Sequence, residues 1–494
     1  MKVNVTVLMD GRETVIPAQT GETILEALAR AGIAVSAPCG GLGRCRKCAV
    51  RATGELACED GARLDGQTVL ACRTRLTGDA RVRVSESKAE ILKTGVSAGE
   101  ETDGEAGLGV SVDVGTTTLA AYLVERSTGR VLASDARLNP QRPHGADVIS
   151  RLSFAIESEE NAALLQREIL AAIDEMTRSM LERAGRAGEE IRCRALVGNT
   201  VMMHLLGGYP ARPLAFAPFT PAYTALHEKE LGGVRTILGG CISGYVGADT
   251  LAAALACGLD ERDENAMLID IGTNGEIMLK KDGRCFACSC AAGPAFEGAH
   301  IACGTGAVAG AIDHARVENG EIVYTTIGGG EATGICGSGL IDLTAALLER
   351  GDITPMGRMA GDVRLSERVY LARSDIREVQ LAKAAIASGI RILAEQAGAA
   401  LADIEKVYLA GGFGNFIGLD SACRIGLLPA ALRAKIVPVG NAAGSGSVRL
   451  LVSERARRRA EALRQATRCV ELAATPDFND VYTDELLFED EDDE

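Results

Sequence analysis

The chain has 494 residues, and 47% of them are apolar, so it can bury a large core and is long enough for two or more domains. Its net charge of -15 disfavours contact with a phosphate backbone, and an aromatic content of 3% without tryptophan leaves few rings for base stacking. Nucleic acid is therefore excluded as an expected partner.

The sequence also indicates where the protein works. No uninterrupted apolar run reaches the roughly 18 residues that a membrane span needs. The opening MKVNVTVLMDGRE alternates like a strand, where a signal peptide would have a basic and then an apolar block. The 15 cysteines, an odd number scattered along the chain, fit a reducing compartment. We expect a cytoplasmic protein with no membrane partner.

The first 85 residues predict a compact module of strands and one helix. Residues 2–8 and 12–17 alternate about Asp10-Gly11, a pair typical of a hairpin turn. Residues 22–31 carry apolar side chains at helical spacing, and Thr20 is a candidate cap. A further alternating run, RVRV, closes the unit, so we expect an α+β fold.

Cysteines in the loop 37–50 point to a metal centre in this module. Cys39, Cys45 and Cys48 have the spacing C-x5-C-x2-C, and Cys72 follows the next strand-like segments. Four thiolates from one loop and one later strand can hold a [2Fe-2S] cluster, with the loop glycines turning backbone amides toward the sulfurs. The four cysteines are therefore the expected ligands.

Two alternatives to this ligand set remain open. Zinc is often held by four cysteines, although its sites usually pair two C-x2-C knuckles and only one is present here. Cys58 is a rival fourth ligand, although two acidic residues follow it directly and disfavour a thiolate. Residues 1–85 resemble a ferredoxin of the adrenodoxin-like group, which implies the β-grasp fold.

The rest of the chain divides by composition. Residues 86–107 are rich in Glu, Gly, Ala and Ser and predict a flexible linker. From Leu108, apolar strands that end in glycine loops alternate with helical patterns such as 146–185 and 374–402, which predicts an α/β domain of two lobes over 108–474. The segment 475–494 is an acidic tail whose self-repulsion favours disorder at its end.

Three glycine loops in the α/β region predict a nucleotide site without a Walker-type loop. DVGTTT begins at Asp113 and DIGTNGE begins at Asp270, each directly after an apolar strand. Gly and Thr supply amide and hydroxyl donors for phosphates, while the two aspartates can position a hydrated Mg²⁺ and the attacking water. A third loop, AGGFGN at 410–415, brings glycine backbone close to a flat group such as adenine.

This set of loops resembles the acetate and sugar kinase, heat-shock chaperone and actin superfamily, whose two ribonuclease-H-like lobes clamp ATP. The resemblance implies that Asp113, Gly115, Thr116 and Thr117 form a first phosphate loop. It implies a second phosphate loop formed by Asp270, Gly272, Thr273 and Asn274. It also implies an adenosine loop formed by Gly411, Gly412 and Phe413.

Further strings resemble the reductive activators of corrinoid proteins over nearly the whole chain, among them NPQRPHGADVISRL, VGNTVMMHLL, AAGPAFEGAHIACG, ICGSGLIDL, DIREVQLAKAAI and GGFGNFIGLDSACRIGLLP. The resemblance implies that a reduced cluster passes one electron to cob(II)amide on a corrinoid protein of a methyltransferase system, which restores cob(I)amide. It also implies ATP binding and hydrolysis and an external low-potential electron donor.

The energetics are compatible with this function. A shortfall of about 200 mV for one electron corresponds to roughly 5 kcal/mol. Nucleotide-driven closure that favours one protein-protein complex can offset that amount. Some relatives carry a dimerisation segment after the linker, but here Gly109 follows it almost directly, so we expect a monomer or a homodimer formed by another route.

Two other functions remain open at this stage. One is an ATP-dependent electron activator of a different low-potential enzyme, and the other is a small-molecule kinase with a regulatory ferredoxin module. Several single residues have both a functional and an ordinary interpretation. His144 and His300 can face the corrinoid or simply support loops, Glu297 can contact nucleotide or stabilise its loop, and Gln380 and Lys383 can reach the nucleotide or belong to a solvated helix face.

Overall fold

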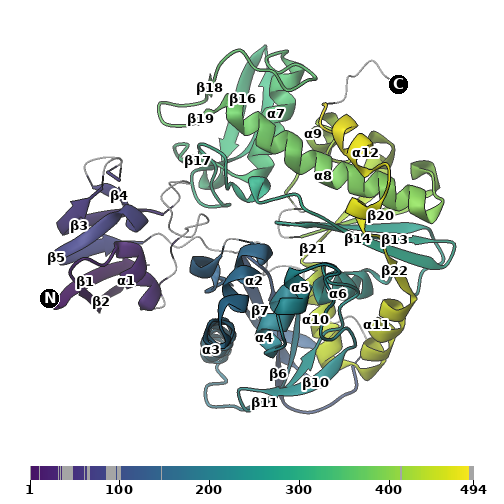
Figure 1. The fold of residues 1–494 in the computed structure, drawn as a ribbon, viewed down its shortest axis with the longest axis horizontal. Coiled ribbons are helices and arrows are strands. Elements are labelled where there is room, and N and C mark those ends of the chain that lie inside the picture. Colours follow the sequence, from purple (N-terminus) through teal and green to yellow (C-terminus); the bar gives the residue numbers. More distant parts are fainter. Residues whose placement is uncertain are drawn as a thin grey trace.

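The structure is a computed structural model that describes residues 2–9, 12–31, 33, 35, 48–59, 62–63, 67–84, 96, 102–145, 147–411, 414 and 416–488. Figure 1 shows a small N-terminal module beside a larger two-lobed domain. No helix in these residues is long and apolar enough to cross a lipid bilayer.

The N-terminal module is one five-stranded sheet with a single α-helix, as predicted. β1 pairs antiparallel with β2 and parallel with β5, and alternate side chains of β5 are buried. This alternation places valine and leucine side chains on one face, where α1 packs. The sheet order is β2-β1-β5-β3-β4, and the bounds are β1 (Lys2–Met9), β2 (Arg12–Gln19), α1 (Ile24–Arg30), β3 (Ala49–Cys58), β4 (Thr68–Leu70) and β5 (Thr74–Arg83).

The start of α1 differs from the expected cap. The amide of Glu26 donates to Thr23 Oγ1 at 3.2 Å, and the amide of Thr23 donates to Glu26 Oε2 at 2.8 Å. This reciprocal pair is a capping box, which satisfies two amides at the helix N-terminus. Thr23 therefore takes the capping role that the sequence had suggested for Thr20.

Each lobe of the larger domain is built on a six-stranded sheet of the same pattern. In each sheet, one central strand pairs antiparallel with a neighbour on one side and parallel with a neighbour on the other. This strand is β6 in the first lobe and β12 in the second, so the two occupy equivalent positions. The first-lobe sheet, in the order β10-β11-β9-β6-β7-β8, comprises β6 (Leu108–Val114), β7 (Thr118–Glu125), β8 (Arg130–Leu138), β9 (Ile191–Gly198), β10 (His227–Leu231) and β11 (Val234–Leu238). The second-lobe sheet, in the order β21-β20-β12-β13-β14-β22, comprises β12 (Ala266–Ile271), β13 (Gly275–Lys281), β14 (Arg284–Cys290), β20 (Lys406–Ala410), β21 (Ile436–Gly440) and β22 (Thr467–Cys469).

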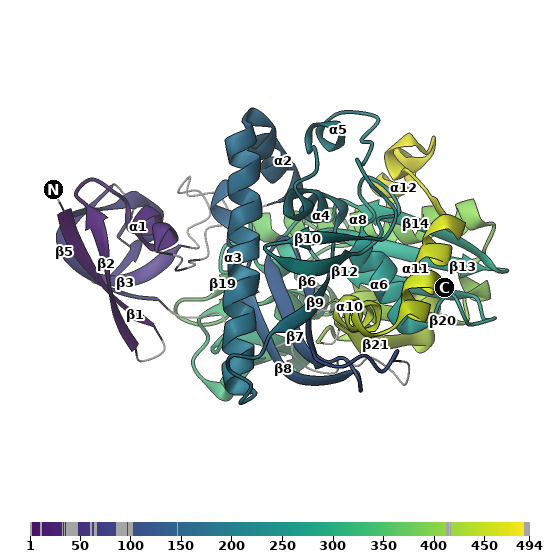
Figure 2. The same cartoon turned by 90° about the horizontal axis from the view of Figure 1, so that it is seen from below.

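Helices cover the first-lobe sheet. The long helical pattern at 146–185 is two helices, because Ser158 leaves helical geometry and its hydroxyl caps the second one by accepting from the Asn161 amide at 3.1 Å. Figures 1 and 2 place α3 on the side of this lobe that faces the N-terminal module. The helices are α2 (Val148–Glu157), α3 (Glu159–Arg183), α4 (Thr200–Gly207) and α5 (Arg212–Ala215). α11 (Glu454–Ala466) instead contacts β14 of the second-lobe sheet.

Two helices rich in small residues join the lobes. α6 (Ala248–Cys257) and α10 (Ala442–Val452) pack against each other so closely that a Cβ on Gly446 would collide with the Ala252 carbonyl oxygen. α10 also packs on β6 and β9. The hydrophobic core around these helices includes side chains of both central sheets, for example Val112 of β6 and Leu268 of β12. The two lobes therefore share a core at their junction.

The second lobe carries an additional small subdomain. A three-stranded sheet and a two-stranded sheet pack with α7 and α8, and α8 spans most of the lobe (Figure 1). The elements are β15 (Ala311–Glu318), β16 (Glu321–Thr326), β17 (Gly334–Ile335), α7 (Gly337–Glu349), β18 (Val363–Arg364), β19 (Tyr370–Leu371), α8 (Arg373–Ala397) and α9 (Leu419–Arg424).

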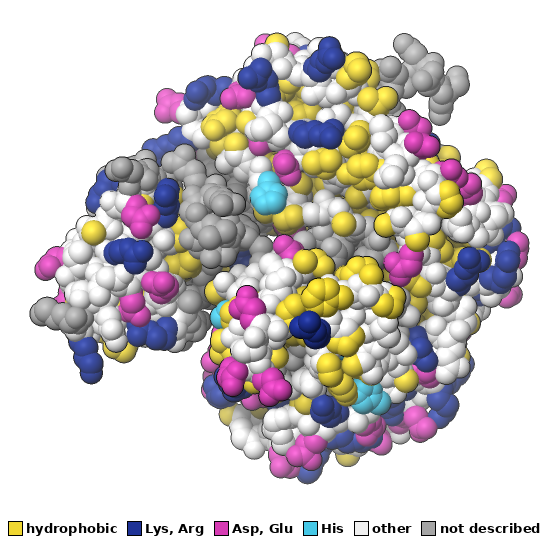
Figure 3. Space-filling model, viewed as in Figure 1, with side chains coloured by type: hydrophobic (Ala, Val, Ile, Leu, Met, Phe, Trp, Pro, Cys, Tyr) yellow, Lys and Arg dark blue, Asp and Glu magenta, His cyan; other side chains and the backbone are white. Residues whose placement is uncertain are grey.

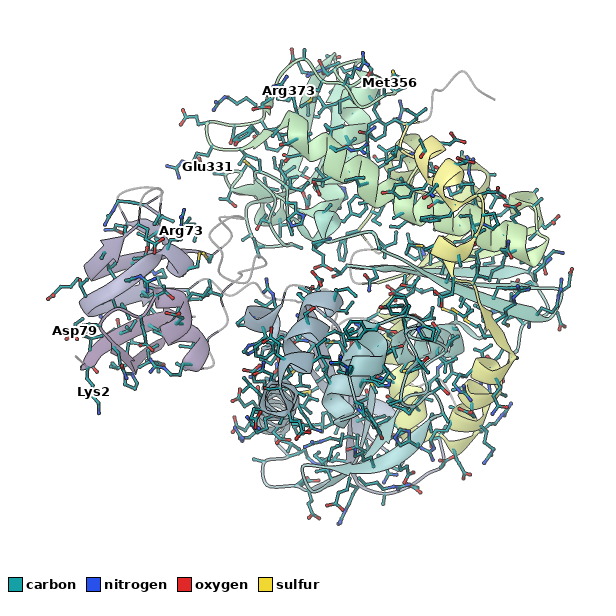
Figure 4. The ribbon with its side chains drawn as sticks, viewed as in Figure 1. Lys2, Arg73, Asp79, Glu331, Met356 and Arg373 are labelled. Carbon is teal, nitrogen blue, oxygen red and sulfur yellow. The ribbon has the colours of Figure 1, made fainter. Side chains whose placement is uncertain are left out.

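The segment expected to be an acidic tail is packed up to Phe488. α12 (Phe478–Asp484) lies on α8, and Phe488 is only 2% exposed. The amide of Phe488 donates to the Pro355 carbonyl at 2.8 Å, beside Met356 at the outer end of the lobe (Figure 4). The last six residues, 489–494, lie outside the described part.

Gln380 and Lys383 of α8 hold this C-terminal segment. Gln380 Nε2 donates to the Leu486 carbonyl at 2.7 Å, and Lys383 Nζ lies 3.8 Å from a carboxylate oxygen of Glu485. Arg391 Nε lies 2.6 Å from the other oxygen of Glu485. Both Gln380 and Lys383 are buried. Neither sequence interpretation of these two residues, nucleotide contact or solvated face, describes what they do.

The first lobe has an exposed apolar surface. Figure 3 shows hydrophobic side chains gathered over the region of α2 and α5. Ile149 of α2 is 54% exposed, and Phe216, directly after α5, is 53% exposed. These side chains contribute little to the core that α2 otherwise helps to form.

Candidate functional site

Two of the predicted cluster ligands meet in the N-terminal module. Cys48 precedes β3 and Cys72 lies on the short 3₁₀ helix η1 (Ala71–Arg73); both are buried, and their sulfurs are 3.1 Å apart. The Cys72 amide also points at the Cys48 sulfur, at 3.5 Å. Two thiols this close can bind one metal ion together. Figure 4 shows Arg73, the next residue, on the side of the module nearest the two-lobed domain.

The remaining cysteines of the module have different surroundings. Cys58 accepts weak hydrogen bonds from the Thr74 hydroxyl at 3.7 Å and from Arg63 at 3.8 Å. Cys39 and Cys45 lie outside the described residues. Among the residues that are described, no three His, Cys, Asp or Glu side chains converge as a complete metal site.

The two phosphate loops are tight turns at equivalent strand ends. In the first, the Gly115 amide donates to the Thr118 carbonyl at 3.1 Å, and a Cβ on Gly115 would come within 2.6 Å of the same oxygen. In the second, the Gly272 amide donates to the Asn274 carbonyl at 3.0 Å. Gly115 therefore has no room for a side chain, since its turn closes directly over that position.

The structure brings the two turns into contact across the lobes. Thr117 Oγ1 and Thr273 Oγ1 are 3.4 Å apart. One carboxylate joins them, because Glu297 Oε2 accepts from Thr117 at 2.7 Å and Glu297 Oε1 accepts from Thr273 at 2.5 Å. The hydroxyl donors of both loops thus converge on a single anionic group.

Four carboxyl groups gather beside these turns. Burial together with the charges of Asp249 and Asp270 raises the pKa of Asp113 to about 8. Burial and Asp249 raise the pKa of Asp270 to about 7, and burial raises the pKa of Asp249 to about 6. Burial, Asp249 and Asp270 hold the pKa of Glu276 well above its usual range. The four carboxyl groups therefore resist ionisation, and a nearby cation would favour their charged forms.

Neighbouring polar groups hold the first loop in place. Asn199, at the start of α4, donates through Nδ2 to Thr116 Oγ1 at 2.9 Å. Arg151 of α2 is fully buried and donates to the Thr116 carbonyl at 2.5 Å, and burial lowers the pKa of its guanidinium to about 9. The backbone and the side chain of Thr116 are both held by partners on helices.

The adenosine loop lies against the second phosphate loop. Gly411 has φ +96°, and a Cβ there would come within 2.8 Å of Asp270 Oδ1 and 2.7 Å of the Ile271 carbonyl oxygen. Gly412 and Phe413 lie outside the described residues. Only glycine suits position 411, because both the backbone angle and the approach to Asp270 exclude a side chain.

The two histidines considered earlier lie away from these contacts. His144 Nε2 is 3.0 Å from Glu168 Oε1, and its ring stacks on Phe154 with centroids 4.6 Å apart. His300 is exposed, with φ +63°, and its Nδ1 lies 3.6 Å from Glu378 of α8. Both contacts are local supports between a loop and a helix.

Sequence reasoning missed several members of the site. Glu276 is the last residue of the string DIGTNGE, but its position in the sequence is typical of an ordinary strand residue. Asp249 lies in the first turn of α6, and Asn441 caps α10, where its amide donates to Tyr122 at 3.0 Å and its side chain hydrogen-bonds Asp113. The available signal was a polar residue at the N-terminal end of each joining helix: Asp249 in the first turn of α6 and Asn441 directly before α10.

The fold and the loops define a class of protein: a ferredoxin-like module attached to an ATP-clamp domain of the acetate and sugar kinase, heat-shock chaperone and actin superfamily. Family models match in the same order along the chain. They are the 2Fe-2S iron-sulfur cluster binding domain over 7–77, the RACo middle region over 108–262, and the C-terminal domain of RACo, the ASKHA domain, over 264–494.

Individual relatives agree with this classification. The corrinoid activation enzyme RamQ of Eubacterium limosum is 32% identical over 420 residues, which cover 77% of this chain and 70% of that protein. The [Co(II) methylated amine-specific corrinoid protein] reductase of Methanosarcina barkeri is 28% identical over 375 residues, 67% of this chain and 68% of that one. A solved reductive activator for corrinoid, iron-sulfur protein superposes with a TM-score of 0.72 at 26% identity and covers 98% of both chains. The chain belongs to the RACo family, which confirms the resemblance seen in its sequence.

Proposed function

We propose that this protein is an ATP-dependent reductive activator that passes one electron from a [2Fe-2S] cluster to the cob(II)amide of a corrinoid protein in a methyltransferase system. The observation that carries the proposal is the convergence of Thr117 and Thr273 from two lobes, beside four carboxyl groups, in a chain that also carries the buried Cys48 and Cys72 pair. The names of its relatives supply the class of partner.

The nucleotide is assigned to the space between the two lobes. Hydroxyls and amides of the loops at Gly115, Thr116, Thr117, Gly272, Thr273 and Asn274 are suitable donors for the phosphates, and the loop at Gly411, Gly412 and Phe413 is assigned to the adenosine. Asp113 and Asp270 are the catalytic candidates: an ionised carboxylate beside the terminal phosphate can orient a water molecule and accept its proton.

The acidic cluster fits a hydrated magnesium ion. Its carboxyl pKa values are raised partly by mutual repulsion, which a divalent cation would reverse. Asp113 and Asp270 are the residues that would hold the ion. Magnesium bound there would supply positive charge to the phosphates.

The cluster is assigned to Cys39, Cys45, Cys48 and Cys72. The close, buried Cys48 and Cys72 sulfurs suit two ligands of one iron. A bound [2Fe-2S] cluster would supply one electron at a time. The protein holds that cluster in the module and must bring the module, the nucleotide domain and the corrinoid partner into one productive assembly.

The overall change consists of a one-electron reduction and the hydrolysis of ATP. An external low-potential donor supplies the electron, the partner's cobalt changes from Co(II) to Co(I), and ATP and water give ADP and phosphate. Hydrolysis transfers no electron, so its contribution is to favour one assembly over another, as in any ligand-driven shift between two states.

A spectroscopic assay tests the function. The purified protein with its cluster is mixed anaerobically with MgATP, a low-potential reductant and a corrinoid protein in the cob(II)amide state, and the visible spectrum is followed. We expect ATP-dependent appearance of cob(I)amide, none with ADP, and none with Asp270→Ala, which should lose ATP turnover but keep the cluster colour. If ATP were consumed by phosphorylation of a small molecule and cobalt stayed unchanged, the chain would be a kinase.

A further inference from the structure

Glu297 occupies a position that the proposed function does not explain. It is the last residue of the 3₁₀ helix η4 (Ala295–Glu297), in the segment between β14 and β15. Gly293 and Gly298 flank this helix with φ +74° and +81°, and a Cβ on Gly298 would come within 2.6 Å of the Thr305 amide. The backbone therefore holds Glu297 in place independently of its side-chain contacts.

Both carboxylate oxygens of Glu297 are engaged by phosphate-loop donors. Thr117 belongs to the first lobe and Thr273 to the second, so this one side chain links the lobes. Each threonine hydroxyl carries a single hydrogen. While that hydrogen is donated to Glu297, it is not available to a phosphate oxygen.

A terminal phosphate and the Glu297 carboxylate resemble each other chemically. Both are anions with several acceptor oxygens, and both prefer hydroxyl donors and a nearby cation. The buried Arg151, whose charge interacts with Glu297, provides such a cation beside the first loop. The terminal phosphate and the Glu297 carboxylate cannot both accept from these two hydroxyls at the same time, because two anions so close together repel each other.

We propose that Glu297 is a positioning residue that binds the two loop threonines when no nucleotide is present and that the terminal phosphate of ATP displaces it. This inference rests on the proposed nucleotide site. It predicts that Glu297 weakens the binding of ATP in particular, since ADP lacks the phosphate that competes with the carboxylate.

Hydrogen bonds connect the segment that follows Glu297 with the rest of the second lobe, so displacement of Glu297 can affect that lobe. Four residues beyond Gly298, the Ala302 amide donates to Asp375 Oδ1 at 2.9 Å, in the first turn of α8. Asp375 is buried and also accepts from the Ala372 amide at 2.9 Å. A shift of η4 therefore pulls on the start of the longest helix of that lobe.

Binding measurements on the full protein with its cluster test this inference. Glu297→Gln keeps the length of the side chain and removes its charge. We expect the dissociation constant for a nonhydrolysable ATP analogue, measured by calorimetry with Mg²⁺, to fall about tenfold, as expected for loss of one competing charge-assisted hydrogen bond. The constant for ADP should change less than about twofold. Glu331→Gln, at an exposed position of the same lobe (Figure 4), is the control and should change neither.

Several outcomes would overturn the inference. Weaker analogue binding in Glu297→Gln would mean that the carboxylate serves the bound state, and equal gains for analogue and ADP would mean that it does not sense the terminal phosphate. A hundredfold fall in the turnover number at unchanged affinity would make Glu297 a catalytic residue instead. If the unaltered protein bound neither nucleotide, the proposed function would fail first.

A second variant covers the case in which Glu297→Gln does not fold. Glu297→Asp keeps the charge but is one methylene shorter, so it cannot reach both threonine hydroxyls. We expect a gain in analogue affinity smaller than tenfold, again without a gain for ADP. An unchanged preference between the two nucleotides in this variant would contradict the displacement.

Discussion

At the scale of single residues, the carboxyl groups between the lobes make the stability of the protein depend on pH. The folded state raises the pKa of Asp113 to about 8, from an ordinary value near 3.8. Between those values the folded protein binds more protons than the unfolded chain, so stability is lost as the pH rises through this range.

The substitution Asp113→Asn isolates this effect. Without nucleotide or Mg²⁺, we expect the unaltered protein to lose on the order of 1 kcal/mol of stability per pH unit through this group between pH 6 and 8. In Asp113→Asn, the free energy of unfolding should fall less steeply with rising pH. At pH 8 this variant should therefore gain stability relative to the unaltered protein. Thermal melts across this pH range measure the difference, with the exposed Asp263→Asn as control. Parallel curves for Asp113→Asn and the unaltered protein would contradict the raised pKa.

The cysteine assignments can also be tested one residue at a time. Cys72 lies against Cys48, whereas Cys58 contacts Thr74 and Arg63. We expect Cys72→Ala to lose most of the visible iron-sulfur absorbance after anaerobic reconstitution, because one of four ligands is removed. Cys58→Ala should keep it. Iron and sulfide analysis provides the measurement, and a full cluster in Cys72→Ala would refute the assignment.

At the scale of elements, helices and strands followed from periodicity, but their distant partners did not. The helical pattern at 374–402 corresponds to α8. The burial of Gln380 and Lys383 on this helix was not predictable, because two polar residues one turn apart are typical of a solvated face. Their partners lie about a hundred residues later, in a segment whose acidic composition suggested a free tail.

The C-terminal segment should therefore stabilise the second lobe. Phe488 is 2% exposed and Leu487 is 48% exposed, so adjacent residues provide a matched pair. We expect Phe488→Ala to reduce the free energy of unfolding by about 3 kcal/mol, as for other buried aromatic truncations. Leu487→Ala should have little effect. Circular dichroism during denaturation measures both, and equal effects would show that the segment is not anchored through Phe488.

At the scale of the whole molecule, the sequence predicted the modules better than the site. The ferredoxin-like fold and the two-lobed domain are confirmed, because strand alternation and glycine turns are local signals. Asp113 and Asp270 were identifiable because each ends an apolar strand before a glycine turn. Asp249, Asn199 and Asn441 were not, because only tertiary packing brings them to the phosphate loops.

The packing of α10 has a consequence for how the molecule is made. This helix is encoded after nearly all of the second lobe, yet it packs on β6 and β9, near the start of the first. A nascent chain that has emerged only as far as residue 440 has the strands of both sheets except β22, but the groove of α6 that receives Gly446 is still empty. We therefore expect the two lobes to complete their shared core together, after α10 has emerged.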